Sequence, residues 1–278
     1  MINNILEPFS YHYMVNAMWV SALVGSLCGF LSCYLIFRGW SLIGDALSHS
    51  ITPGIAIAYM LGLPFSLCAF IAGSLATIAM LFFKTYTTLK ESVIIGLIFS
   101  FFFGCGLFII SLSPTSVNIH TIILGNLLAI TPNDSLQLLV ISVISLSILS
   151  IKWKDFLVIF FDESHASSIG LHTTFLKIIF FTLLSIATVA ALQTVGSFLV
   201  ISMLVTPGAT GYLLTDKFSN LLFIAISIGS ATSFVGTYIS YFLDGATGGI
   251  IILLQTAVFL ITLLIAPKHG IFHMRHKS

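Results

Sequence analysis

The chain has 278 residues, of which 58% are hydrophobic and only 7% are charged. Soluble domains carry about a quarter charged residues, so this composition excludes an ordinary water-soluble fold and indicates an integral membrane protein. The formal net charge of +1 and the lack of a basic patch interleaved with aromatic residues argue against nucleic-acid binding. The four cysteines lie in apolar stretches and are expected to be small hydrophobes in helices, not a disulfide set: Cys28, Cys33, Cys68 and Cys105.

Nine apolar stretches come close to the roughly 20 residues that a membrane-spanning helix needs. In chain order they are Met14–Phe37, Trp40–Gly62, Pro64–Phe83, Ser92–Leu112, Ser135–Ile151, Phe175–Leu192, Val195–Leu214, Ser219–Leu243 and Gly248–Ala266. The apolar stretch Ile119–Ile130 is too short to cross and is expected to be interfacial or re-entrant. The sequence thus predicts an all-α transmembrane bundle of about nine spans, with eight as the alternative, in one domain over residues 1–278.

The basic residues predict the orientation of this bundle. With nine spans and an external N-terminus, all 10 Lys and Arg residues fall on one face, whereas an even number of spans leaves some of them on the other. Basic residues cluster on the cytoplasmic side, so the N-terminus is expected outside and the C-terminus in the cytoplasm. No cleavable signal peptide is expected, because no basic residue precedes the first apolar run and that run is too long for a signal core.

The longest predicted cytoplasmic connection, Lys152–Thr174, carries the signals of a short helix. Asp162 is a good N-cap and Gly170 a good C-terminal stop. The residues between them make about two helical turns: Glu163, Ser164, His165, Ala166, Ser167, Ser168 and Ile169. Apolar neighbours give the helix one apolar side: Phe160, Phe161, Ile169 and Leu171.

Asp45 and His49 are the acid and the histidine that fall well inside a predicted span. An ionisable group at membrane depth is costly and marks a functional site. Because the two residues are four apart, a helix places them on one face, and carboxylate plus imidazole suits Mn²⁺, Fe²⁺ or Zn²⁺. The alternative is a structural hydrogen-bonded pair between helices, with Asp45 buried and neutral.

Two ligands do not complete a metal site, since a first-row ion takes roughly four to six. Water, other helices or the same face of a second subunit are candidate sources of the rest. Pro53 frees a backbone carbonyl near the pair, which would allow a kink or a carbonyl ligand, and an ordinary membrane-helix proline is the equal alternative. Thr206-Pro207-Gly208 repeats this pattern. A C-terminal tail with His269, His273 and His276 is expected to be a solvated basic end rather than a metal-capturing segment.

Several enzyme signatures are absent from the sequence. It contains no Gly-x-x-x-x-Gly-Lys-Ser/Thr loop, so the chain is not expected to bind ATP in the usual way. It contains no His-Glu-x-x-His, which argues against an intramembrane zinc protease, and no Gly-x-Ser-x-Gly hydrolase elbow. Transport of a divalent metal past Asp45 and His49 is one interpretation of the pair. A proton-driven secondary carrier with Asp45 and His49 as the relay is the main alternative. A membrane enzyme is the other, although no further acid or base inside a span would serve it.

Four blocks of residues, in order, resemble the signature motifs of the manganese/zinc/iron class of bacterial ABC permeases. They are Gly39–Ser50; Phe161–Leu171; Gln193–Val200 with Leu204–Ala209; and Asp244–Gly249 with Ala266–Gly270. The resemblance covers nearly the whole chain and is closest to the manganese and iron(II) branch, although zinc permeases share the motifs.

This resemblance implies a fold similar to the membrane subunit of the vitamin B12 importer, in the bacterial cytoplasmic (inner) membrane. It implies a non-enzymatic transport subunit, without its own ATPase site or resident cofactor, that carries a divalent metal as cargo. It implies as partners ATP-binding-cassette ATPase subunits, a second permease subunit (identical or related) and an extracytoplasmic metal-binding protein. The family's metal-coordinating pair falls on Asp45 and His49. Its ATPase-coupling element falls on the short helix bounded by Asp162 and Gly170.

Overall fold

The computed structural model describes residues 6–112 and 130–266, with the side chain of Thr85 excepted, and over these residues the chain is helical. The helices are, in order, η1 (Glu7–Ser10), α2 (His12–Arg38), α3 (Ile43–Ser50), α4 (Thr52–Leu61), α5 (Phe65–Tyr86), α6 (Glu91–Leu112), α8 (Pro132–Phe161), α9 (Glu163–Ser168), α10 (Thr173–Val195), α11 (Ser197–Leu214), α12 (Phe218–Leu243) and α13 (Thr247–Ile265). The predicted all-α membrane bundle is confirmed. The predicted segment Ile119–Ile130 lies, apart from Ile130, outside the described residues.

Eight of the described helices are long and apolar enough to span a membrane: α2, α5, α6, α8, α10, α11, α12 and α13. The predicted span Trp40–Gly62 is instead two consecutive helices, α3 of 8 residues and α4 of 10, interrupted at Ile51. Pro53 explains the interruption, because it has no N–H to donate to the carbonyl of His49. The hydroxyl of Thr52 donates to that carbonyl instead, at 2.6 Å. Eight is therefore the number of continuous spanning helices among the described residues, and α3 and α4 together occupy the ninth predicted stretch.

Helix α8 differs most from its predicted bounds. It runs for 30 residues to Phe161, ten beyond the predicted end at Ile151, so much of the predicted loop Lys152–Thr174 is helical. At about 1.5 Å per residue such a helix is roughly 45 Å long, more than the hydrocarbon thickness of about 30 Å. Lys152 and Asp155, which pair at 2.9 Å, thus belong to a helix extension and not to an irregular connection.

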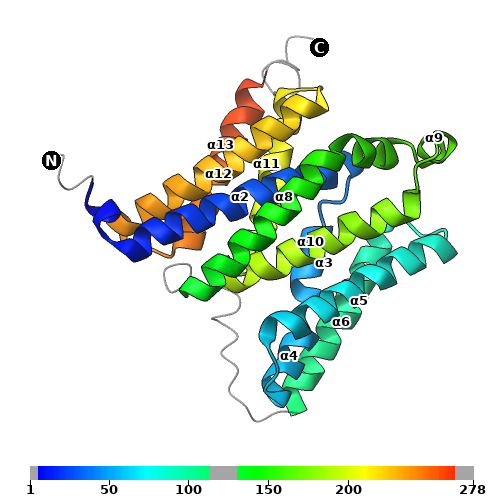
Figure 1. Cartoon of the computed structure of the whole chain (residues 1–278), viewed down its shortest axis with the longest axis horizontal. Helices are drawn as coiled ribbons and strands as arrows, with labels where there is room; N and C mark the ends of the chain where they lie inside the picture. The colour runs from blue at the N-terminus through cyan, green and yellow to red at the C-terminus, as the bar shows by residue number, and fades with distance from the viewer. Residues whose placement is uncertain (1–5, 113–129, 267–278) are drawn as a thin grey trace.

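Helix α2 is the central helix of the bundle, with α8 and α10 on one side and α11, α12 and α13 on the other (Figure 1). In the membrane-spanning stretch of α2, 72% is buried inside the bundle, whereas in that of α13, at the periphery, 11% is buried. Small residues let α2 and α12 approach closely: a Cβ atom on Gly25 would collide with the carbonyl of Gly229, and the Ser21 and Thr237 hydroxyls meet at 2.9 Å. Such close packing of small residues is how helices associate in lipid.

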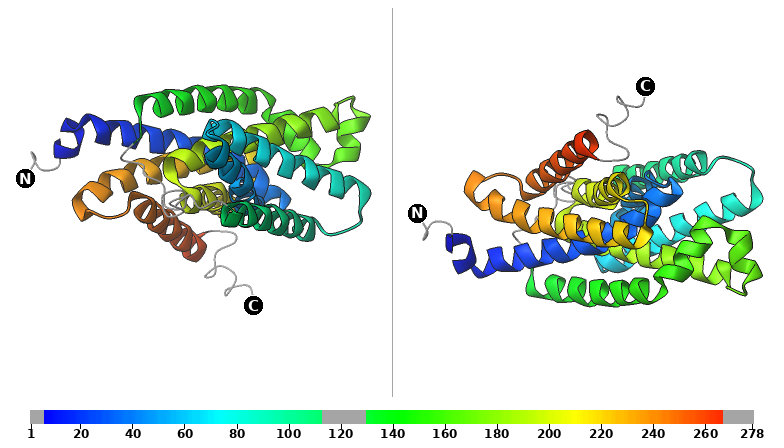
Figure 2. Two further views of the ribbon diagram at one scale, coloured as in Figure 1. Left: turned by 90° about the horizontal axis from the view of Figure 1, so that it is seen from below. Right: turned by 90° about the horizontal axis from the view of Figure 1, so that it is seen from above.

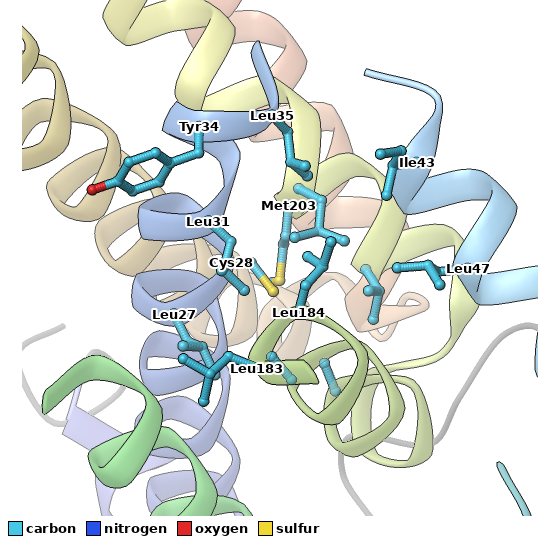
Figure 3. Packing of buried hydrophobic residues seen from close by; sticks show 14 of the residues in the cluster. Leu27, Cys28, Leu31, Tyr34, Leu35, Ile43, Leu47, Leu183, Leu184 and Met203 are labelled. Atoms are coloured by element: carbon cyan, nitrogen blue, oxygen red, sulfur yellow. The ribbon is translucent and has the colours of Figure 1, made fainter. Parts of the chain in front are cut away.

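The core lies where α2 meets α3, α10 and α11 (Figure 3). Leu31 and Leu35 of α2 face Leu47 of α3, Leu184 of α10 and Met203 of α11, and all five side chains are almost fully buried. One face of α3 is therefore fixed in the core. The opposite face of this short helix is available to the polar side chains that the sequence places there.

The C-terminal ends of α2, α5 and α8 and the start of α6 lie at the end of the bundle that carries α9, opposite the N-terminal end of α2 (Figures 1 and 2). We call this the charged end of the bundle, because three ion pairs join residues there. Lys84 and Arg38 both pair with Glu91, at 2.5 and 3.9 Å, and Lys177 pairs with Glu163 at 2.5 Å. Three of the basic residues predicted to share one face take part in these ion pairs: Arg38, Lys84 and Lys177.

Candidate metal and coupling sites

Helix α3 brings Asp45 and His49 together. The Asp45 Oδ1 and His49 Nε2 atoms are 3.4 Å apart, so the spacing of four places both side chains on one face, as predicted. The Asp45 side chain is 46% exposed and the His49 side chain 27% exposed, so neither is sealed inside the subunit. This exposure argues against the alternative in which Asp45 is buried between helices of the same subunit.

Two phenylalanine rings of α6 hold the imidazole of His49. The rings of Phe99 and Phe103 lie parallel, 5.7 Å apart, and each meets the imidazole edge-on at a centroid distance of 5.5 Å. Edge-to-face packing of this kind is specific in geometry. This contact was not predicted, although Phe99 and Phe103 are four residues apart in the predicted span Ser92–Leu112.

The pair offers two ligand side chains and no more from its surroundings. Over residues 6–112 and 130–266, no group of three or more His, Cys, Asp or Glu side chains could hold a metal ion. The carbonyl that Pro53 frees is that of His49, and it accepts the Thr52 hydroxyl proton, so the predicted carbonyl ligand is already hydrogen-bonded. Ser48 likewise donates to the Gly44 carbonyl at 2.8 Å. Within the described part of one chain, the pair thus supplies two of the roughly four to six ligands that a first-row metal ion would need.

The predicted short helix in the connection is present as α9, capped at both ends. The Asp162 carboxylate accepts the N–H of His165 at 3.0 Å, the N-cap contact expected of this residue. Gly170 has φ of +84°, the left-handed region that ends helices, and the Leu171 N–H donates back to the Ala166 carbonyl at 3.1 Å. The helix ends at Ser168, one residue before the predicted Ile169, which is its C-cap.

Most of α9 faces outward at the end of the bundle (Figure 1). Ala166 is fully buried and fixes one side of the helix, and Glu163 is tied to Lys177 of α10. The other residues of the predicted coupling segment are exposed: Asp162, Glu163, Ser164, His165, Ser167, Ser168, Ile169 and Gly170. Two large apolar side chains lie beside them, Phe161 at 73% and Ile169 at 56% exposed, so this surface combines apolar and polar groups as a protein-docking surface does.

The second proline motif serves packing in the described structure. Pro207 lies inside α11, and the N–H of Gly208 donates to the Ser32 hydroxyl of α2 at 2.9 Å. His269, His273 and His276 of the predicted tail lie outside the described residues.

Comparison with known proteins places this geometry in context. The model of the ABC 3 transport family matches residues 10–266. The chain is 58% identical over 278 residues to a chelated iron transport system membrane protein of Yersinia pestis, covering all of this chain and 95% of that protein. It is 44% identical over 270 residues to a manganese transport system membrane protein of Synechocystis, covering 96% and 87%. The solved structure of PsaBC from Streptococcus pneumoniae in complex with Fab is similar over the full length of both chains, with a TM-score of 0.86 and 32% identity.

Proposed function

Because the chain belongs to the ABC 3 transport family, it is a multi-pass membrane permease subunit of an ABC transport system, and we propose that it carries Mn²⁺ or Fe²⁺ into the cytoplasm past Asp45 and His49. The observation that carries this proposal is the pairing of a carboxylate with an imidazole on the open face of α3. Family membership favours this class of transporter over the proton-driven carrier.

The incompleteness of the pair supports a site shared between two permease subunits. Two copies of α3 around a two-fold axis would supply two carboxylates and two imidazoles. Four such ligands meet the minimum that a first-row ion takes, and two carboxylates balance its charge, which eases the loss of its water shell. The exposure of Asp45 in the single chain is what such a shared site requires. A related but different permease with the same pair would serve equally well.

The cargo follows from the ligand types and from the relatives. Carboxylate and imidazole accept Mn²⁺, Fe²⁺ and Zn²⁺. The Yersinia relative is named for chelated iron and the Synechocystis relative for manganese, which favours Mn²⁺ and Fe²⁺ over Zn²⁺ for this chain. Neutral imidazole is the form that binds a metal, so acidification is expected to weaken binding.

We assign α9, with its caps Asp162 and Gly170, as the docking element for a separate ATPase subunit. Its exposed residues, its apolar neighbours Phe161 and Ile169 and its place at the charged end of the bundle support this role. Basic residues gather at that end, so it faces the cytoplasm, and the opposite end receives metal from an extracytoplasmic binding protein. Closure of the ATPase dimer on ATP would then move α9 and switch access to the metal pair.

Uptake by proteoliposomes that contain this permease, its ATPase and its binding protein tests the proposal. We expect ATP-dependent uptake of Mn²⁺ or Fe²⁺ that Asp45→Asn and His49→Ala abolish while the complex still assembles. Ser41→Ala, a small change at a residue just before α3, is a matched control that should transport normally. Uptake that ignores ATP but follows a proton gradient would contradict the ABC mechanism, and unaffected variants would remove Asp45 and His49 from the path.

A further inference from the structure

A buried tryptophan joins four helices at the charged end of the bundle. Trp40, in the turn between α2 and α3, is 4% exposed, and its indole N–H donates to the Glu91 carboxylate at the start of α6. Lys84, in the last turn of α5, pairs with the same carboxylate at 2.5 Å and lies 5.0 Å from the centre of the indole ring. A buried indole N–H requires such a partner, and a charged acceptor makes the hydrogen bond stronger than a neutral one.

The same cluster contacts the end of α8, where α9 begins. The indole of Trp40 packs edge-on against Phe160, with ring centres 5.4 Å apart. Arg38, which also faces Glu91, donates to the backbone carbonyl of Phe160 at 3.1 Å. Phe160 is two residues before Asp162, the N-cap of α9. A movement of the α8–α9 corner would therefore change the contacts of Trp40 and Arg38 with Phe160.

From this cluster two short routes lead to His49. Along the first, the N–H of Ile43, where α3 begins, donates to the Trp40 carbonyl at 3.0 Å, and α3 then carries His49 itself. Along the second, Glu91 begins α6, and Phe99 lies eight residues on, about 12 Å along the helix, against the His49 ring. The Trp40–Glu91 contact thus connects the two helices that enclose the imidazole.

We propose that Trp40 and Glu91 are positioning residues that transmit movement of α9 to the Asp45–His49 pair, by keeping the first turns of α3 and α6 in register. This inference rests on the proposed function, since it takes α9 as the ATPase docking element and α3 as the metal-binding one. Packed side chains and hydrogen bonds can couple two distant sites when both sites shift the equilibrium of the same structural element. A measurement of the coupling between the two sites is therefore the test. Neither residue touches the metal in this scheme.

The test measures the number of Mn²⁺ ions transported per ATP hydrolysed by the full complex in proteoliposomes. Trp40→Phe keeps an aromatic ring but removes the N–H donor, and Glu91→Gln keeps an acceptor for the indole but removes the charge that Lys84 and Arg38 face. Trp19→Phe is the matched control, because Trp19 is on α2 but 65% exposed. The same samples are assayed for complex assembly, and Mn²⁺ binding to the purified complex is measured separately.

We expect Trp40→Phe to lower the transport-to-hydrolysis ratio by about fivefold or more, the usual size of one coupling free energy, with Mn²⁺ binding close to wild type. Glu91→Gln should lower it in the same direction, and the double variant should be no worse than the poorer single variant, because both residues act through one contact. Trp19→Phe should leave the ratio unchanged.

Two results separate failure of this inference from failure of the proposed function. If wild type shows ATP-driven uptake but the Trp40 and Glu91 variants keep the wild-type ratio, with any loss of uptake matched by a loss of assembled complex, then the cluster is structural only and the inference is overturned. If wild type shows no ATP-driven uptake, or Asp45→Asn leaves uptake intact, then the proposed function itself is wrong, and the inference fails with it.

Discussion

The N-cap of α9 gives a prediction whose size follows from the structure. A helix of 6 residues is too short to be stable by itself, so its population depends on its caps and on the burial of Ala166. Asp162→Ala removes the carboxylate that accepts the His165 N–H at 3.0 Å. Loss of such a cap costs about 1 kcal/mol, which lowers the ratio of folded to frayed helix by about fivefold.

If the ATPase subunit binds only the folded form of α9, its apparent affinity is proportional to the fraction of molecules in which α9 is folded. We therefore expect Asp162→Ala to weaken ATPase binding by up to about fivefold. Asp162→Ser, which supplies another good N-cap but no charge, should stay close to wild type. Binding of the ATPase subunit to the permease in nanodiscs, measured by biolayer interferometry, gives both affinities.

The comparison between Asp162→Ala and Asp162→Ser separates recognition of the Asp162 carboxylate from recognition of the helix that it caps. Equal losses in Asp162→Ala and Asp162→Ser would show that the ATPase recognises the carboxylate itself and not the helix that it caps. Unchanged binding in Asp162→Ala would refute the reasoning that this cap controls the fraction of α9 available for docking. Uptake by the same variants should follow the binding affinities at limiting ATPase concentration.

Two further predictions concern stability in detergent. Gly25→Val places a side chain against α12 and should destabilise the chain by about 1–3 kcal/mol, seen as a lower thermal midpoint of unfolding. Gly104→Ala is the control, because a Cβ atom there meets nothing within 4 Å. An unchanged midpoint for Gly25→Val would refute the close approach of α2 and α12. Tyr34→Phe removes a buried hydrogen bond to the Trp153 carbonyl, at 3.0 Å, and should cost about 0.5–1.5 kcal/mol. Tyr86→Phe, at a position 74% exposed, should cost nothing measurable, and equal effects of the two tyrosine changes would contradict this assignment.

Much of the fold was predictable because lipid constrains the sequence so strongly. A spanning helix must be apolar along its length, and each of the eight long described helices overlaps one predicted span. The helix α9 was predictable because its caps are local, and Asp162 and Gly170 act as expected. The extension of α8 was not predictable from apolarity, since Lys152 and Asp155 leave the apolar pattern while the backbone stays helical.

The candidate site was predictable only in part, because its parts come from different helices. Asp45 and His49 share one helix, so their spacing predicted their contact. The contacts of His49 with Phe99 and of Trp40 with Glu91 join residues about 50 apart, and no local pattern predicts which helices pack together. A helix that is apolar on all sides has no polar or apolar face in its sequence pattern, so the sequence does not predict which neighbour each face packs against.

The division of one predicted span into α3 and α4 bears directly on the mechanism. An uninterrupted helix over Trp40–Gly62 would transmit a shift at Trp40 through about six turns. The break at Ile51 instead makes α3 a segment of 8 residues, with its apolar face in the core, Asp45 and His49 on its opposite face and the Trp40–Glu91 contact at its start. A small rigid-body shift of this segment would change the spacing of Asp45 from its counterpart in a second subunit while α4 stays packed against α5 and α6. In the proposed mechanism, the proline that interrupts the span would let α3, with Asp45 and His49, shift without disturbing the rest of the bundle.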